Sequence, residues 1–234
     1  MYELERFNRD ILQTATHYEA LRYISDYVQR FLDKAFSGEK YTIPISVDNL
    51  LKILEIPVKE DYIFLNYKNL GSLNFYNNEP YICITPKLYE FYSNWVKIGC
   101  IAEYICLSED ILDKRKRIFS FGEKRLKVFH KYGTVSDMVA YSLMLPLKQS
   151  IEYFMEGNFI ERINSKYLWK KYGELAIGYC IEGKYPIEKK TFAYHHLMQT
   201  LEAKAYLSDW KEYNKIHERI LDFLDTVFME EDKR

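Results

Sequence analysis

The residues best suited to chemistry lie close together in one apolar stretch, residues 94–107, with the sequence NWVKIGCIAEYICL. Glu103 offers a carboxylate that could act as a general base, and Cys100 and Cys106 offer thiols that could bind a soft metal ion. A metal site built from these three side chains is one hypothesis for the stretch. A set of Glu103, Cys106 and His130 is another, although neither set has a spacing recognised in metal sites.

The element that positions these side chains follows from the hydrophobic pattern. Residues 94–107 leave no continuous polar face, which predicts a buried central helix. Lys97 and Glu103 are its only charged residues, and because they lie six residues apart they do not share a helical face. A buried Glu103 therefore needs another partner, since an unpaired carboxylate is costly to bury.

The sequence from Ala35 to Pro146 resembles the ImmA/IrrE family of metallopeptidase-like proteins. The segment KIGCIAEYIC (97–106) falls where the family carries R-F-T-x-A-H-E-x-x-H. The flanking matches are IPISVDNLLKILEIPV (43–58), the strand-like LGS (70–72) and YICI (81–84), and the helix SDMVAYSLMLP (136–146). The resemblance implies a zincin-like metallopeptidase fold.

The same resemblance implies that the zinc ligands of the family are lost. The first zinc histidine falls on Ala102, the catalytic glutamate on Glu103, the second histidine on Cys106, and the third ligand, a glutamate, on Val135. Alanine and valine have no donor atoms, so the two-histidine face that binds zinc is missing. Without the ion the pKa of a water molecule stays far above neutral pH, so Glu103 has no activated nucleophile to generate. We therefore predict no metal, no cofactor and no hydrolysis by the family mechanism.

A second candidate site is the basic segment between residues 108 and 133. Phe119, Phe121 and Phe129 are interleaved with its cationic side chains, a combination that can hold phosphates and stack bases. The cationic residues are Lys114, Arg115, Lys116, Arg117, Lys124, Arg125, Lys127 and Lys131. Four acidic residues in the same segment offset this charge, so a solvated surface insertion is the alternative.

Composition excludes several classes of protein. A net charge of -1 over 234 residues favours neither a polyanion-binding protein nor an acidic tail protein. The sequence has no apolar run of membrane-spanning length and no signal peptide, so we predict a cytoplasmic protein that does not contact a membrane.

The four cysteines form no C-x-x-C pair, which indicates free thiols in a reducing compartment. The 22 tyrosines are either amphipathic core filler or a contact surface.

The pattern of elements predicts an α+β fold with a small antiparallel sheet beside the central helix. Residues 2–36 carry apolar residues at spacings of three and four with one gap near Thr14, which predicts one amphipathic helix or two abutting ones. Strands are predicted at 56–67, 72–76 and 81–85, separated by turn residues typical of an antiparallel meander. Ser46 is predicted to cap a short helix, and Thr85-Pro86 to open the next one.

After Pro146 the pattern is helical throughout. We predict a peptidase-like domain with an N-terminal amphipathic helix over residues 1–150 and an all-helical extension over residues 151–234. The helices on either side of Gly183 favour ordinary αα-hairpin packing. The alternative is a helix-turn-helix, which some members of the resembled family carry.

These observations favour a non-catalytic regulatory or inhibitory protein that binds a protein partner through the metallopeptidase-like scaffold. The resemblance implies a phage- or prophage-borne regulator that sequesters a repressor or inhibits a host defence enzyme such as a CRISPR effector. Nucleic acid would be contacted through that partner or through the basic segment. The alternatives are a DNA-binding transcriptional regulator using the C-terminal helices and a metallopeptidase with relocated ligands. The oligomeric state is not predicted.

Overall fold

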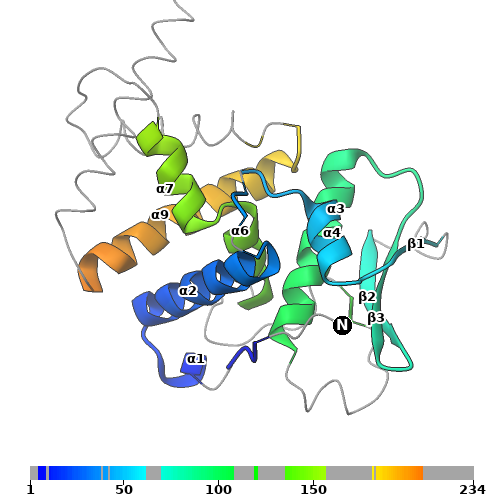
Figure 1. Cartoon of the computed structure of the whole chain (residues 1–234), viewed down its shortest axis with the longest axis horizontal. Coiled ribbons are helices and arrows are strands. Elements are labelled where there is room, and N and C mark those ends of the chain that lie inside the picture. Colours follow the sequence, from blue (N-terminus) through cyan, green and yellow to red (C-terminus); the bar gives the residue numbers. More distant parts are fainter. Residues whose placement is uncertain are drawn as a thin grey trace, which may run out of the picture.

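A computed structural model describes residues 5–8, 11–37, 39–41, 43–61, 70–107, 119–120, 135–156, 181 and 183–207. In these residues a small sheet lies at one end of the molecule and the helices gather beside it (Figure 1). The predicted α+β class is therefore confirmed. No helix in the described ranges is long and apolar enough to cross a membrane.

Two abutting helices open the described part of the chain. Helix α1 spans Ile11–Thr14 and α2 spans His17–Ala35, as the gap in the apolar pattern near Thr14 predicts. Thr16 caps α2 by accepting a hydrogen bond from the Glu19 backbone N–H, and the Glu19 carboxylate accepts one from the Thr16 backbone N–H at 2.7 Å. This reciprocal box satisfies two N–H groups that a helix start would otherwise leave free.

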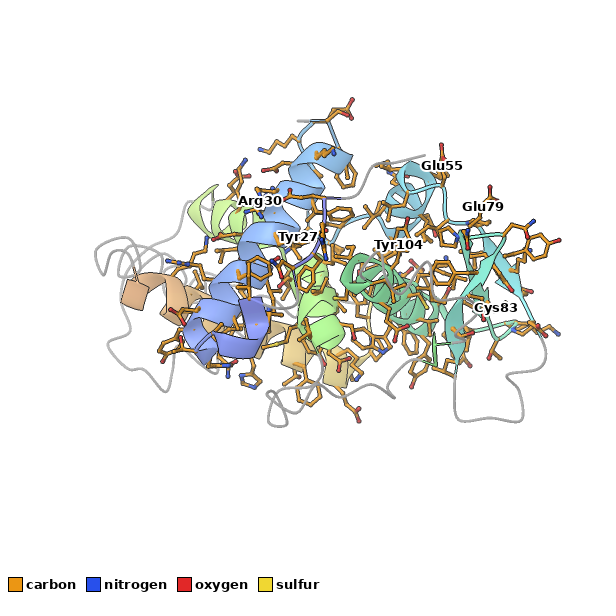
Figure 2. All side chains as sticks on the ribbon, turned by 90° about the horizontal axis from the view of Figure 1, so that it is seen from below. Tyr27, Arg30, Glu55, Glu79, Cys83 and Tyr104 are labelled. Carbon is orange, nitrogen blue, oxygen red and sulfur yellow. The ribbon has the colours of Figure 1, made fainter. Side chains whose placement is uncertain are left out.

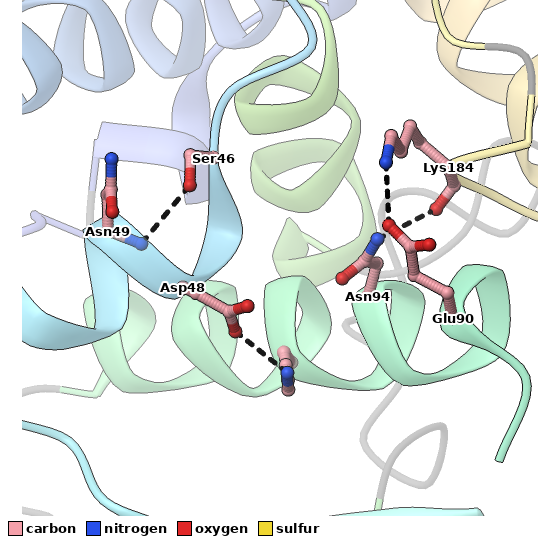
Figure 3. A network of polar contacts seen from close by, with 7 residues as sticks. Ser46, Asp48, Asn49, Glu90, Asn94 and Lys184 are labelled. Atoms are coloured by element: carbon pink, nitrogen blue, oxygen red, sulfur yellow. Dashed lines mark hydrogen bonds and ion pairs between the residues drawn. The ribbon is translucent and has the colours of Figure 1, made fainter.

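The next two helices pack on each other, and the second also packs on the sheet. Helix α3 spans Val47–Ile53, and Ser46 caps it through a hydrogen bond from the Asn49 N–H, as predicted (Figure 3). Helix α4 spans Glu90–Cys106 and is the predicted central helix. The prediction that Thr85-Pro86 opens it is wrong. The Thr85 N–H bonds to the Leu70 carbonyl and Lys87 adopts a φ of 61°, so the chain turns there before the helix begins at Glu90.

The sheet contains β1 (Val58–Glu60), β2 (Gly71–Tyr76), β3 (Glu79–Ile84) and β4 (Phe119–Ser120), in the order β1-β3-β2-β4. Strands β2 and β3 form the predicted antiparallel hairpin through Asn77 and Asn78, both at positive φ. Strand β1 pairs parallel to β3, so the prediction of a purely antiparallel meander is wrong. The apolar β3 takes an interior position, while the charged side chains of β1 suit an edge.

Helix α4 packs closely against the sheet. A Cβ atom at Gly71 on β2 would lie 2.6 Å from the Cys83 carbonyl oxygen and 2.6 Å from Val96 Cγ1. Gly71 therefore permits the close approach of α4. Nine residues of α4 are buried, which confirms the prediction of a buried central helix.

The remaining helices complete one hydrophobic core. Helix α6 spans Val135–Met144, α7 spans Leu147–Glu156 and α9 spans Ile187–Leu207. Helix α9 packs on α2 and α6, and Lys204 on α9 pairs with Asp26 on α2 at 2.6 Å. The core contains residues from both sides of residue 150, and the predicted division there stays a prediction. The predicted C-terminal helices at 165–181 and 209–229 lie outside the described residues, except for Ile181.

Candidate functional site

The structure places in the core the three positions at which the resemblance predicts degenerate zinc ligands. Ala102 and Cys106 are buried on α4, and Val135 is buried at the start of α6. The hydrocarbon side chains of Ala102 and Val135 thus pack among apolar neighbours. Within the described ranges, no group of three or more His, Cys, Asp and Glu side chains is placed to hold a metal ion.

Glu103 is the one surviving position of the resembled motif, and it is mostly buried. Its Oε2 atom has no hydrogen-bond partner among the described residues, and burial raises its pKa from the ordinary value of 4.5 to about 8. The charge of Asp137 on α6 adds to this rise in pKa. At neutral pH the Glu103 carboxyl is therefore mainly protonated. Lys97 does not neutralise it, because Lys97 pairs with Asp48 on α3 at 2.8 Å.

Cys100 and Cys106 do not behave as a ready pair of metal ligands beside Glu103. Burial raises the pKa of the Cys100 thiol well above its ordinary value, and the neighbouring Glu103 charge adds to the rise. Metal ligands of this type must lose their protons before they bind. The burial of Cys100 and Glu103 therefore opposes metal binding by the set Cys100, Glu103 and Cys106. Cys83, Cys100 and Cys106 are buried and form no disulfide bond with one another, as predicted, and Cys180 lies outside the described residues.

A buried serine–histidine pair joins α6 to α9. Ser142 Oγ and His196 Nε2 are hydrogen-bonded at 2.8 Å, and burial, with a smaller contribution from the charge of His17, lowers the His196 pKa to about 3. The cavity beside them holds about 10 Å³. A nucleophile with its base must reach a substrate, and this volume has room for about one water. The pair is therefore part of the packing between the two helices. No local pattern in the sequence predicts this pair, because its two members lie 54 positions apart.

The cationic residues of the basic segment, from Lys114 to Lys131, lie outside the described residues. The described strand β4 falls within that segment and pairs with β2. The alternative of a DNA-reading helix falls on α9. On this helix His195 is exposed, His196 is buried, and the Lys189 Nζ atom lies 4.7 Å from the Trp95 ring centroid.

Large exposed apolar side chains occur at the N-terminal ends of α4 and α9, two ends that the ion pair between Lys184 and Glu90 joins. We call this the α4–α9 aromatic surface and define it by Tyr89, Tyr92, Ile187 and Phe192. Tyr89 is 74 % exposed and Ile187 is 78 % exposed. Large apolar side chains gathered at the surface in this way are typical of contact sites. Tyr27 and Tyr194 fill the core, while Tyr76 and Tyr89 are exposed, and a tyrosine contact surface stays a prediction.

Polar contacts hold the two helix ends together beneath this surface. Lys184, in the turn before α9, donates to the Glu90 carboxylate on α4 at 2.7 Å, and the Asn94 amide donates to the Lys184 carbonyl (Figure 3). Lys184 also lowers the pKa of the Glu90 carboxyl. The Phe192 ring centroid lies 6.2 Å from the Tyr141 ring centroid, so Phe192 contacts the core residue on α6. The contacts of Lys184 thus fix the backbones of the two helix ends relative to each other.

A separate groove lies between the end of the sheet, the loop after α3, and α4. We call it the tyrosine groove, and it holds about 250 Å³. Its lining residues are Leu54, Glu55, Pro57, Lys59, Tyr76, Glu79, Pro80, Tyr81 and Tyr104. Glu55 follows α3, Glu79 begins β3 and Tyr104 belongs to α4, and in Figure 2 the two glutamates lie toward the sheet while Tyr104 lies on the central helix. Tyr104 follows Glu103 on α4, so the groove adjoins the central helix without including the degenerate ligand positions.

Comparison of the chain with models of protein families, with curated proteins and with solved structures finds no match.

Proposed function

We propose that this protein is a non-catalytic regulator that binds a protein partner on a zincin-like, metallopeptidase-like scaffold. The resemblance of residues 35–146 to the ImmA/IrrE family supports the scaffold. The chemistry of two ligand positions supports the loss of catalysis, because Ala102 and Val135 are buried hydrocarbon side chains. In this proposal Glu103 has a structural role between α4 and α6, where it is a neutral carboxylic acid at physiological pH.

The observation that carries the proposal is the α4–α9 aromatic surface. Aromatic residues are enriched at protein interfaces and dominate their binding energy. Tyr89 and Phe192 expose large ring areas, and their backbones belong to two helices that Lys184 ties together. A surface ordered in advance loses little conformational entropy on binding, so its buried area contributes more fully to affinity.

The resemblance indicates the kind of partner. Family members act on repressors and regulators of mobile elements and stress responses, so we propose a partner of this regulatory class. A specific form of the proposal is inhibition of a host defence enzyme. In that form the basic segment between Lys114 and Lys131 would add contacts to the enzyme or to its nucleic acid.

The experiment compares three forms of the tagged full-length chain in a quantitative pull-down from native lysate, followed by calorimetry with the recovered partner. The wild type should capture one abundant partner. A double variant, Tyr89→Ser with Phe192→Ser, should lose that partner, because truncating two central aromatic anchors costs on the order of 2–4 kcal/mol of binding free energy. Ile11→Ser is the matched control, since Ile11 is an exposed apolar residue on α1.

The proposal predicts that Ile11→Ser binds like the wild type in both assays. Circular dichroism on all three forms checks that the substitutions leave the fold intact. Equal capture by the double variant and the wild type would contradict a role for this surface. A wild-type protein that captures no partner from any relevant lysate would contradict the proposed function.

A further inference from the structure

We propose that the tyrosine groove binds an extended, proline-containing peptide segment that carries an arginine. This inference goes beyond the proposed function, because it concerns a different surface and names the chemistry of its ligand. It rests on the lining of the groove, its size and the balance of charge around it.

The lining of the groove suits proline rings. Tyr76, Tyr81 and Tyr104 come from β2, β3 and α4, and Pro57 and Pro80 add further rigid apolar faces. Aromatic-lined grooves bind polyproline II segments because such segments are already extended and lose little entropy on binding. Tyrosine also brings a hydroxyl group that can donate to the exposed peptide carbonyls of such a segment.

The size of the groove favours side chains of a peptide over a small-molecule ligand. Pockets for drug-sized ligands usually hold roughly 300–1,000 Å³ and enclose most of the ligand. The tyrosine groove holds about 250 Å³, and Tyr76, Glu55 and Glu79 on its lining are exposed to solvent. An occupant therefore inserts only part of its structure, as an extended segment does when it lays successive side chains into a groove.

The charge of the groove favours a cationic side chain in the peptide. Glu79 brings an exposed carboxylate that can pair with a cation, and the other charged side chains of the described lining are Glu55 and Lys59. The Lys59 Nζ atom lies 4.6 Å from the Tyr81 ring centroid, which shows that a ring in this groove already accepts a cation on its face. Arginine suits the site better than lysine, because its planar guanidinium stacks on tyrosine and pairs with a carboxylate through two hydrogen bonds.

The test is fluorescence anisotropy of the full-length protein with a labelled synthetic peptide of the pattern P-x-x-P-x-R. Saturable binding is expected. Tyr76→Ala should weaken it by about tenfold, because Tyr76 is an aromatic anchor of the groove. Glu79→Lys should also weaken binding and reduce its dependence on salt, because it removes the attraction between carboxylate and guanidinium.

Two control peptides and one control variant make the test specific. A peptide with glutamate in place of arginine, and one with alanines in place of both prolines, should each bind at least about tenfold more weakly. Tyr89→Ala is the matched variant, since Tyr89 is a highly exposed tyrosine on the α4–α9 aromatic surface, and it should leave peptide binding unchanged. Thermal unfolding of Tyr76→Ala should match that of the wild type, because Tyr76 is 69 % exposed at the hairpin end.

The inference would be overturned by absence of saturable binding, by equal binding of either control peptide, or by equal losses in Tyr76→Ala and Tyr89→Ala. Its failure is distinguishable from failure of the proposed function. Peptide binding depends on Tyr76, whereas partner capture depends on Tyr89 and Phe192.

Discussion

Replacing Glu103 with glutamine should make the protein more stable at neutral pH. The Glu103 carboxyl has a pKa of about 8 in the folded chain, against an ordinary value of 4.5, because burial penalises its charged form. Between these two pH values folding takes up a proton. The free energy of unfolding of the wild type therefore falls as the pH rises from 4.5 to about 8.

The magnitude follows from the size of the pKa shift. Each pH unit between the two pKa values costs about 1.4 kcal/mol, so at pH 7 the wild type has lost about 3 kcal/mol relative to its stability in acid. Glutamine has no proton to take up, and this loss disappears in the variant. The buried amide group introduces a donor that needs its own partner, so we expect a net gain of about 1–3 kcal/mol at pH 7.

The assay is urea denaturation of wild type and Glu103→Gln at a series of pH values from 4.5 to 8. The difference between the two unfolding free energies isolates this carboxyl, because the other titrating groups are common to both proteins. It should grow in favour of the variant by about 1.4 kcal/mol per pH unit. Glu39→Gln is the control, since Glu39 is exposed, and its difference from the wild type should not follow this slope.

A constant difference across this pH range would refute the reasoning. It would mean that the Glu103 carboxyl ionises in the folded protein as it does in the unfolded chain. The neutral, structural place that we assign to Glu103 between α4 and α6 would then be wrong.

Three further substitutions test the close packing at Gly71 and the burial of His196. Gly71→Ala should lower the free energy of unfolding by about 1–3 kcal/mol, since its Cβ would lie 2.6 Å from the Cys83 carbonyl oxygen, and an unchanged denaturation midpoint would contradict this close packing. In the comparison variant Gly183→Ala the new Cβ meets nothing within 4 Å, so it reports only the cost of a φ of +73°, about 1–2 kcal/mol. For His196, whose folded pKa of about 3 lies below the ordinary 6.5, stability should fall as the pH falls from 6.5 toward 3. His196→Gln lacks this titration, so the amount by which it is less stable than the wild type should shrink by about 2 kcal/mol as the pH falls from 6.5 to about 5. A difference in unfolding free energy that does not change with pH would contradict a neutral buried imidazole.

The helices could be predicted because their signals are local. Ser46 precedes an apolar periodic run, and the structure places it at a helix start. The uniformly apolar residues around Ile98 and Ile101 predict a buried helix, and α4 is buried. Such signals depend on neighbours a few residues away, so a single sequence contains them.

The order of the strands could not be predicted in the same way. The positions of β2 and β3 follow from their alternating residues and from the turn at Asn77 and Asn78. The parallel pairing of Val58 with Ile82 depends on which strand fills the centre of the sheet, and that is decided by packing against α4. Competition between distant segments leaves no local signal in the sequence.

The candidate surfaces were beyond sequence analysis for the same reason. Tyr76 and Tyr104 lie far apart in the sequence, and nothing in the residue pattern brings them to one groove. Tyr89 and Phe192 are likewise separated by about half of the span of the described core, which runs from Phe7 to Ala203. The abundance of tyrosine was the available signal, and it could not distinguish core tyrosines from exposed ones.

The central claim is that this protein holds its partner without cutting it. The most direct measurement is mass spectrometry of the purified complex after incubation with added Zn²⁺, which follows the intact mass of the captured partner. We predict that both chains keep their full mass and that the complex persists. Time-dependent appearance of partner fragments, lost in Glu103→Gln, would contradict it.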